Sequence, residues 1–169
     1  FAEILPLIEK SPEIFRCAPS YIEIEIYRGC EYKCTFCPRQ FISNDSDGAY
    51  LEIDFLKKII SDIQISFASP LTICFGGMGE PLLHPNFTDL IEMTLCNEHV
   101  KELIIETALY PDVDKLEIFI SGLTPEKASK LSIIVNLSTL DERQYENIYG
   151  KNRLEEILVK VERLNKVLS

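Results

Sequence analysis

Short apolar runs alternate with helical segments along most of this chain. Residues 21–27, YIEIEIY, alternate apolar and polar side chains as strands do, and residues 71–75, LTICF, form an apolar run between a proline and a glycine. Further strands are expected at residues 103–107 and 131–138. Because helical segments follow these runs, about four strand–helix units predict a parallel sheet with right-handed crossovers.

The expected helices share apolar side chains that recur every three to four positions. They lie at residues 53–63, 87–95, 111–121 and 154–168, with a short helix after Thr124-Pro125. The segment at 111–121 is ambiguous, because Val113, Leu116 and Ile120 favour a helix whereas LEIFI is also compatible with a strand. Four units are too few to close an eight-stranded barrel, so the predicted fold is α/β, either an open sheet or a partial, incomplete TIM-like barrel.

The last expected helix has an apolar face and an acidic face. The apolar stripe is expected to hold Leu154, Ile157, Leu158, Val161, Leu164 and Leu168. The acidic residues, among them Glu155, Glu156 and Glu162, are expected to form a solvated face.

The chain divides into a lead-in and one domain. Residues 1–20 are expected to form a helical lead-in, with Ser11-Pro12 at a helix start and a break at Ala18-Pro19. Residues 21–169 are expected to form the domain itself, which agrees with a length of 169 residues. Because the chain does not begin with methionine, we expect it to be a piece of a longer protein.

The charge and hydropathy of the chain argue against two classes of protein. Its 27 acidic and 17 basic residues give a net charge of −10, so nucleic acid is not expected as the main partner. No apolar run reaches the ~18 residues of a membrane span, and the first residues lack the basic segment of a signal peptide. We therefore expect a cytoplasmic protein whose six cysteines are thiols or metal ligands rather than disulfides.

Three cysteines lie close together in RGCEYKCTFCPR, residues 28–39, directly after the first expected strand. Cys30, Cys34 and Cys37 are separated by three and then two residues, which places a soft-ligand site on one loop. A structural zinc site takes four ligands, so a non-catalytic zinc module would need a fourth one from elsewhere in the chain. A cubane iron–sulfur cluster held by three thiolates instead leaves one iron open to another molecule.

Several isolated residues have two interpretations each. A fourth zinc ligand would come from His84 or Cys74, although His84 is more typical of a turn or packing residue than of a ligand or a base. Single cysteines in apolar surroundings act as small core residues, which is the expectation for Cys17, Cys74 and Cys96. Glu23 and Glu25 either line a wet or charge-paired cavity inside a barrel or face solvent on an open sheet.

Polar or glycine-rich segments follow all four expected strands. The cysteine-containing loop follows the first, GGMGEP (residues 76–81) the second, Glu106-Thr107 ends the third and residues 136–138 end the fourth. Parallel sheets place their sites at the carboxyl ends of the strands, so these segments are expected to converge. Glycines allow the backbone to approach a ligand closely, and the Glu80 carboxylate can accept hydrogen bonds from an ammonium group.

These motifs resemble the radical S-adenosylmethionine (SAM) enzymes. The resemblance rests on the cysteine spacing with Phe36 before the last cysteine, on GGMGEPLLHP at residues 76–85, and on VNLSTLDERQYENIYG at residues 135–150. The last segment is similar to the subgroup that often carries a C-terminal SPASM or twitch domain with auxiliary clusters. Relatives complete a barrel with further strand–helix units, which are absent from these 169 residues.

The resemblance implies a role for each matching residue. Cys30, Cys34 and Cys37 would hold a 4Fe–4S cluster whose open iron chelates SAM. An electron donor would reduce the cluster, and cleavage of SAM would release a 5′-deoxyadenosyl radical that abstracts hydrogen from an unidentified substrate, a peptide or a small molecule. The SAM contacts would come from Phe36 (adenine), Gly76, Gly77 and Glu80 (methionine amino group), Thr107, Asn136 and Ser138.

Two departures from the family pattern concern the SAM contacts. The third expected strand ends in Thr107-Ala108-Leu109 where relatives usually read Thr-Asn-Gly, and Ser138 stands where an aspartate is common. The fourth strand would also lie at the edge of the incomplete sheet. An exposed strand edge pairs readily with another copy, so a dimer through this edge is expected.

Overall fold

The computed structural model of the protein describes residues 19–42, 47–66 and 69–168. The helical lead-in that the sequence predicts at residues 1–20 lies almost entirely outside the described residues. No helix within the described ranges is long and apolar enough to cross a membrane.

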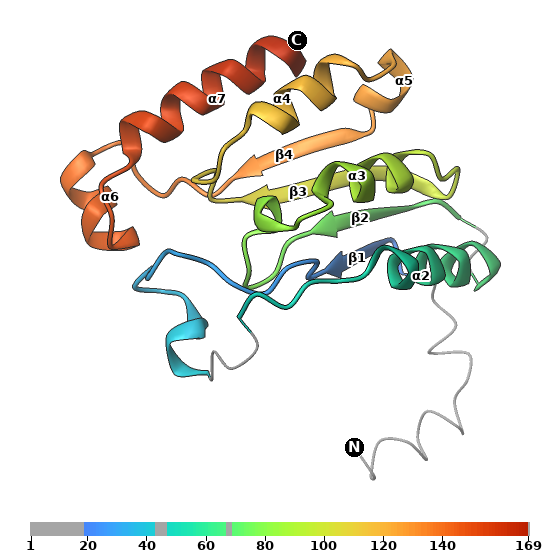
Figure 1. The fold of residues 1–169 in the computed structure, drawn as a ribbon, viewed down its shortest axis with the longest axis horizontal. Coiled ribbons are helices and arrows are strands. Elements are labelled where there is room, and N and C mark those ends of the chain that lie inside the picture. The colour runs from blue at the N-terminus through green and yellow to red at the C-terminus, as the bar shows by residue number, and fades with distance from the viewer. Residues whose placement is uncertain (1–18, 43–46, 67–68, 169) are drawn as a thin grey trace.

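The described residues contain one four-stranded parallel sheet with the strands in sequence order. Its strands are β1 (Tyr21–Ile24), β2 (Leu71–Phe75), β3 (Val100–Thr107) and β4 (Leu131–Val135). All four arrows point the same way in Figure 1, so their carboxyl ends form one edge. The sheet does not close on itself, which confirms the predicted α/β fold of a partial barrel.

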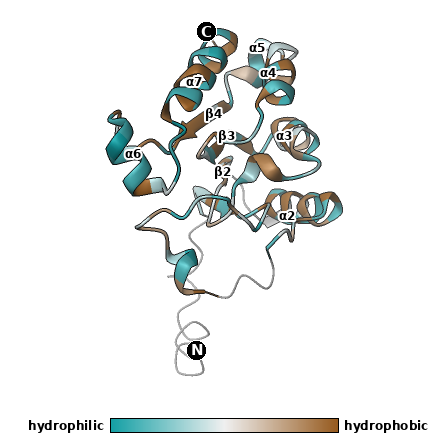
Figure 2. Ribbon diagram, turned by 60° about the vertical axis from the view of Figure 1, so that its left-hand side comes forward, coloured by the Kyte–Doolittle hydropathy of each residue, from teal (hydrophilic) through white to brown (hydrophobic). Residues whose placement is uncertain are grey.

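Most of the helices form an outer layer along the strands, whereas the helix that follows β4 lies beyond the carboxyl ends of the strands (Figures 1 and 2). The helices are α2 (Ile53–Ser66), α3 (Phe87–Leu95), α4 (Asp114–Ser121), α5 (Pro125–Ala128), α6 (Glu142–Tyr149) and α7 (Leu154–Leu168), with short 3₁₀ helices η1 (Pro38–Phe41) and η2 (Pro81–Leu83). Local chemistry sets several of these boundaries. The Asp141 side chain caps α6 by accepting from the Gln144 N–H at 2.8 Å, and Gly150 ends that helix with a φ of 74°.

One face of the sheet is buried beneath the helices and the other is open. Ile24, Ile73, Phe75, Leu103 and Ile105 alternate onto the buried face and pack against apolar residues of the helices. The opposite face exposes Tyr21, Glu23, Glu25 and Ile134, because no described segment covers it. The apolar core therefore lies on the helix side, and the open face corresponds to the inside of the incomplete barrel.

Two strands are shorter than the sequence pattern predicts. The chain leaves the sheet after Ile24, and Tyr27 instead bridges antiparallel to Tyr50. The Ile26 carbonyl accepts from the Leu51 N–H at 2.8 Å, so residues 26–28 pair with the segment before α2. The fourth strand ends at Val135 rather than at residue 138, because the following backbone bonds to a side chain of α6. The third strand, in contrast, begins three residues early, at Val100.

Three other expectations are settled by burial and local structure. The ambiguous segment forms helix α4, and Leu116 and Ile120 face the core. The predicted stripe of α7 is partly wrong, because Leu158 and Leu168 are more than one-third exposed and the buried series includes Lys160. Cys96 is exposed at the end of α3, so the expected core position is wrong for this cysteine, whereas Cys74 is buried in β2 as predicted.

Candidate functional site

The carboxyl edge of the sheet holds a cavity of about 610 Å³. Segments that follow or end all four strands line it: the cysteine loop (residues 28–39), the β2 tip (residues 76–81), Glu106 and Ala108 at the end of β3, and the β4 tip (residues 136–138). Figure 1 shows these segments gathered at the left-hand end of the strands, beside α6. The lining includes Cys30, Cys34, Cys37, Phe36, Gly77, Glu80, Asn136 and Ser138. Gly76 is buried outside this lining, as is Thr107.

The cysteine loop is held against the carboxyl end of α6. The Lys33 N–H donates to the Tyr149 carbonyl at 3.3 Å and the Thr35 N–H donates to the Ile148 carbonyl at 2.9 Å. These bonds satisfy two of the carbonyls that every helix leaves free at its last turn. A loop that looks independent in the sequence therefore depends on a helix more than 100 residues later.

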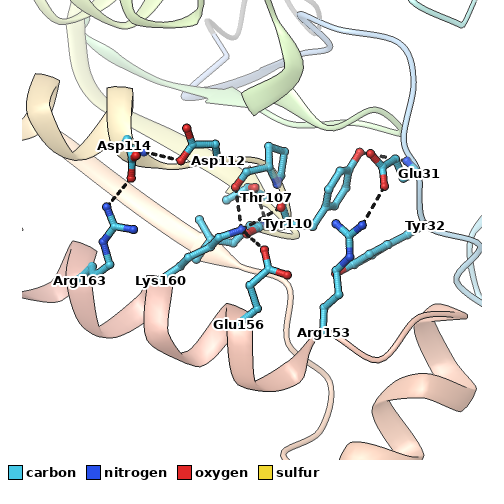
Figure 3. Close-up of polar contacts among 12 residues, drawn as sticks. Glu31, Tyr32, Thr107, Tyr110, Asp112, Asp114, Arg153, Glu156, Lys160 and Arg163 are labelled. Atoms are coloured by element: carbon cyan, nitrogen blue, oxygen red, sulfur yellow. Dashed lines mark hydrogen bonds and ion pairs between the residues drawn. The ribbon is translucent and has the colours of Figure 1, made fainter.

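Ion pairs fasten both ends of the loop. Glu31 accepts from Lys151 at 2.8 Å, and also from Arg153 at 3.2 Å (Figure 3), which connects the loop to the segment between α6 and α7. Arg39 pairs with Asp47 at 2.6 Å and also donates to the Cys30 carbonyl at 3.2 Å. The Arg39 contact fixes the backbone of a cysteine directly.

The three thiols are half-buried and face the same cavity. Burial raises the pKa of Cys34 to about 11, with smaller contributions from the neighbouring Cys30 and Cys37, and burial also raises the pKa of Cys30. Metal ligation requires thiolates, so binding would release protons from these groups.

The described residues bring three cysteines to one cavity but do not form an assembled site for a single metal ion. No three His, Cys, Asp or Glu side chains among them converge on one metal position. Both nitrogens of His84 are engaged, since one contacts the Leu51 carbonyl at 2.8 Å and the other accepts from the Asn86 N–H at 3.0 Å. Cys74 lies in β2 beside Tyr21. A cluster, in contrast, takes one thiolate on each of three separate irons.

Glycines let the β2 tip pass close to the cysteine loop. A Cβ at Gly79 would overlap the carbonyl oxygen of Tyr27, and Gly77 has a φ of 102°. The Met78 N–H donates to the Glu25 carboxylate at 2.9 Å, so this carboxylate supports the tip from the open face. Sequence reasoning named Gly77 but missed Gly79, whose signal was its place in the same GGMGEP motif.

Glu80 is only 2% exposed and bonds to the β3 tip, residues 107–111. Its carboxylate accepts from the Thr107 hydroxyl at 2.6 Å and from the Ala108 N–H at 2.9 Å. It also accepts from the Leu82 N–H at 3.2 Å and caps η2. Burial raises the pKa of this carboxyl in spite of these hydrogen bonds, which act in the opposite direction. Glu80 therefore both lines the cavity and organises a neighbouring strand end.

The β3 tip is held from its other side by a buried lysine of α7. The Lys160 ammonium donates to the carbonyls of Tyr110 at 2.8 Å, Pro111 at 2.9 Å and Leu109 at 3.3 Å, and pairs with Glu156 (Figure 3). Leu109 has a φ of 57°, a conformation that costs a non-glycine residue about 1 kcal/mol or more. Lys160 stabilises this turn by donating to the carbonyls of Leu109 and of the two residues that follow it.

The β4 tip is tied to α6 by one hydroxyl group. The Tyr149 hydroxyl accepts from the Ser138 N–H at 2.9 Å, contacts the Ser138 hydroxyl at 2.9 Å and donates to the Asn136 carbonyl at 3.1 Å. Tyr149 also lines the cavity, with its ring edge-on to Phe36. Sequence reasoning quoted YENIYG as part of a family segment but gave this tyrosine no role.

An aromatic group connects the cysteine loop to the rest of the site. The Tyr32 ring lies 4.7 Å from the Tyr110 ring, its hydroxyl bonds to that of Tyr145 at 2.9 Å, and Arg153 lies over Tyr110. The Tyr110 hydroxyl accepts from the Glu31 N–H at 3.0 Å (Figure 3). These contacts join segments that are far apart in sequence, so no local motif predicts them.

The family model described as the radical SAM superfamily matches residues 24–169. A GTP 3′,8-cyclase of Mannheimia succiniciproducens is 24% identical over 85% of this chain and 40% of its own length. A tungsten-containing aldehyde ferredoxin oxidoreductase cofactor-modifying protein of Pyrococcus furiosus is 29% identical over 66% of this chain and 38% of its own length. The chain therefore spans about 40% of the length of the curated relatives it matches.

Solved structures show the same fold. Streptococcus suis SuiB, crystallised with its precursor peptide SuiA, has a TM-score of 0.69 and 18% identity over 98% of this chain and 35% of its own. BtrN, in complex with AdoMet and 2-DOIA, has a TM-score of 0.50 and 20% identity over 69% of this chain and 56% of its own. Because the family model covers most of the residues and these folds agree, the chain belongs to the radical SAM superfamily.

Proposed function

We propose that this chain is the part of a radical SAM enzyme that binds a 4Fe–4S cluster and SAM. Cys30, Cys34 and Cys37 are the residues that would hold the cluster. When bound and reduced, the cluster supplies the electron that cleaves SAM to a 5′-deoxyadenosyl radical, which then abstracts hydrogen from the substrate. The observation that carries this proposal is that the three thiols share one cavity with the β2 and β4 tips.

The surrounding residues have separate tasks in this proposal. The buried Glu80 carboxylate would accept the SAM ammonium group while keeping its bonds to the β3 tip, since a carboxylate has about four acceptor positions. Phe36, which is largely exposed at the mouth of the cavity, would pack against the adenine. Gly77, Asn136 and Ser138 would contact the rest of SAM from the tips. Gly76 and Thr107 support these contacts from beneath the cavity surface.

The identities of the substrate and of the electron donor are properties of the whole enzyme rather than of this chain alone. We propose a peptide or small-molecule substrate that enters from the open face of the sheet, and an external electron donor in the cytoplasm. SuiB binds a peptide and BtrN binds 2-DOIA, so the same fold accommodates both classes in other proteins. A SPASM or twitch domain remains our prediction for the longer protein.

Anaerobic reconstitution with iron and sulfide tests the proposed function. The expected result is about four irons per chain and formation of 5′-deoxyadenosine when SAM and a reductant are added. A Cys34→Ala variant should lose both the bound iron and the formation of 5′-deoxyadenosine, because the loop has only three thiols to hold the cluster. Purified protein that holds zinc alone, and yields no 5′-deoxyadenosine after reconstitution, would overturn the proposal in favour of a structural metal module.

The outer edge of β4 supports a second, smaller proposal of dimer formation. Within the described ranges no strand pairs with this edge, and Ile134 beside it is 46% exposed. Unpaired strand edges associate readily, so we propose that the isolated chain dimerises through β4. Sedimentation at increasing concentration should reveal dimers, and a monomer at every concentration would contradict this proposal.

A further inference from the structure

Tyr149 contacts two walls of the cavity, the cysteine loop and the β4 tip. Its hydroxyl reaches the β4 tip, and its main chain and ring reach the cysteine loop. The side chain is 1% exposed, although the cavity that it lines is open to solvent. One buried residue at the end of α6 therefore connects two segments that follow the two outermost strands of the sheet, β1 and β4.

The hydrogen bonds at the Tyr149 hydroxyl use its full capacity. A phenol donates one hydrogen bond and accepts two. Here the Asn136 carbonyl takes the donated bond, and the N–H and hydroxyl of Ser138 can fill the two acceptor positions. All three partners belong to the β4 tip, so the hydroxyl fixes both the position and the orientation of this short segment.

Other contacts of the β4 tip are few. The Asn136 N–H donates to the Thr107 carbonyl at 2.8 Å, which continues the pairing of β4 with β3 by one residue. Beyond that bond, the side chains of Asn136 and Ser138 are exposed, and the helix capped by Asp141 begins only at Glu142. Leu137 is partly buried against the core, so the direction of the tip after Asn136 depends on this packing and on the hydrogen bonds of Tyr149.

The contacts of Tyr149 with the cysteine loop are of two kinds. Its carbonyl accepts from the Lys33 N–H at 3.3 Å, next to Cys34. Its ring lies 6.2 Å from Phe36 at 83° and 5.6 Å from Tyr32 at 52°, on the stretch that carries the cysteines. Residues 32–36 and residues 136–138 are thus kept at a fixed separation by one residue, through its carbonyl, its ring and its hydroxyl.

We propose that Tyr149 is a positioning residue for SAM, which sets the separation of the cysteine loop and the β4 tip. This inference rests on the proposed function, because it assumes that SAM lies between these two walls. A ligand that contacts both walls binds tightly only if the walls are already in place, since ordering a loop on binding weakens the affinity. The hydroxyl, rather than the ring, provides this ordering.

The test is Tyr149→Phe in the full-length protein, reconstituted with its cluster. The change removes the hydroxyl and retains the ring, so the packing against Phe36 and Tyr32 and the backbone bond to Lys33 remain. We expect iron content and the cluster absorbance to be unchanged, and the Kd for SAM, measured by equilibrium dialysis, to rise about tenfold.

Tyr145→Phe is the matched control. Tyr145 lies on the same helix and is also 1% exposed, and its hydroxyl bonds to Tyr32 of the cysteine loop rather than to the β4 tip. A general loosening of α6 or of the loop would weaken SAM binding equally in both variants. Because Tyr145→Phe leaves the hydrogen bonds of the Tyr149 hydroxyl to the β4 tip in place, the proposal instead expects the Kd for SAM to rise clearly more in Tyr149→Phe than in Tyr145→Phe, and an equal rise would contradict it.

A double variant shows whether Tyr149 acts through the β4 tip. Ser138→Ala removes one of the three partners of the hydroxyl, so its effect on the Kd should be smaller in the Tyr149→Phe background than in the wild type. Fully additive effects, or equal Kd values for wild type and Tyr149→Phe, would overturn the inference and leave the proposed function standing. Wild-type protein that has a cluster but does not bind SAM would instead overturn the proposed function itself.

Discussion

The β3 and β4 tips lie side by side at the carboxyl edge of the sheet, but they are held by different chemistry. Two buried ionisable groups hold the β3 tip, with the Glu80 carboxylate on one side and the Lys160 ammonium on the other. One neutral hydroxyl, that of Tyr149, holds the β4 tip. Buried charges are expensive to leave unpaired, whereas a lost neutral hydrogen bond costs much less.

Because of this difference, we expect the supports of one tip to affect mainly the stability of the fold and the support of the other to affect mainly ligand binding. The β3 tip lies mainly beneath the cavity, where its turn at Leu109 is fully buried, so its supports should govern the stability of the fold. The β4 tip lines the cavity directly, so its support should govern affinity with little effect on stability.

The largest effect is expected for Lys160→Met. Methionine retains the length and apolar stem of lysine but leaves three carbonyls of the β3 tip without their donor. We expect a loss of about 3 kcal/mol in the free energy of unfolding, measured by urea denaturation. Glu156→Gln, which alters only the half-exposed partner of Lys160, is the control and should cost less than about 1 kcal/mol. A loss of similar size in both variants would contradict the role assigned to the three carbonyls.

Glu80→Gln should have the next largest effect. The amide group must place its NH₂ against one of the donors that now meet the carboxylate, either Ala108 N–H or Leu82 N–H. We expect a loss of about 2 kcal/mol in the free energy of unfolding at neutral pH. Wild-type stability in this variant would show that the β3 tip does not need the carboxylate.

The same pair of proteins has a predicted pH dependence. The pKa of Glu80 is raised in the folded protein, so between the ordinary value of 4.5 and the folded value the native state binds more protons than the unfolded state. The contribution of this titration to stability is therefore full below pH 4.5 and is lost as the pH rises through the folded pKa. Unfolding at a series of pH values should show the wild-type advantage over Glu80→Gln declining across that window and then levelling off. An advantage that increases with pH would contradict the raised pKa.

A smaller effect on stability is expected for Tyr149→Phe. The lost hydrogen bonds go to the β4 tip, where the side chains of Asn136 and Ser138 are exposed. Water can therefore replace some of these hydrogen bonds. We expect a loss of about 1 kcal/mol in the free energy of unfolding, measured as for Lys160→Met. A loss as large as that of Lys160→Met would abolish the distinction between the two tips.

The smallest effect should follow from Glu31→Gln on the cysteine loop. Glu31 is exposed, and its pairs with Lys151 and Arg153 are screened by solvent and salt. Its pKa is lowered, first by the Lys151 hydrogen bond, so the carboxylate persists to a lower pH than in an unpaired glutamate. Denaturation curves of variant and wild type should converge as the salt concentration rises, and a gap that persists in high salt would indicate a stronger interaction than an exposed pair provides.

The sequence predicts the elements of this fold better than the contacts between their ends. Alternating and helical periodicities identified all four strands and helices α2, α3, α4 and α7, because burial on one face imposes those periods, but they did not identify α6. The ends of β1 and β4 were extended too far, because Tyr27 and Ser138 continue an alternating pattern while their backbones bond outside the sheet. Alternation records which side chains are apolar and does not show where pairing stops.

The candidate site is predictable to a similar degree. The cysteine spacing, GGMGEP and the place of both after strands indicate the cavity, since parallel strand ends converge. The supporting residues Tyr149 and Lys160 escaped notice because a tyrosine or lysine on an amphipathic helix has no local signature. Lys160 even stands at a buried position of α7, where the pattern favours an apolar residue. Such roles depend on segments from 11 to more than 100 residues away.

The central claim is that the cysteine loop holds a cluster with one iron free for SAM. Electron paramagnetic resonance of the reconstituted and reduced protein, recorded before and after addition of SAM, tests it most directly. We predict that SAM changes the spectrum of the reduced cluster in the wild type, and that Cys34→Ala shows no cluster signal to change. A wild-type cluster signal that SAM leaves unaltered at saturating concentration would contradict the claim.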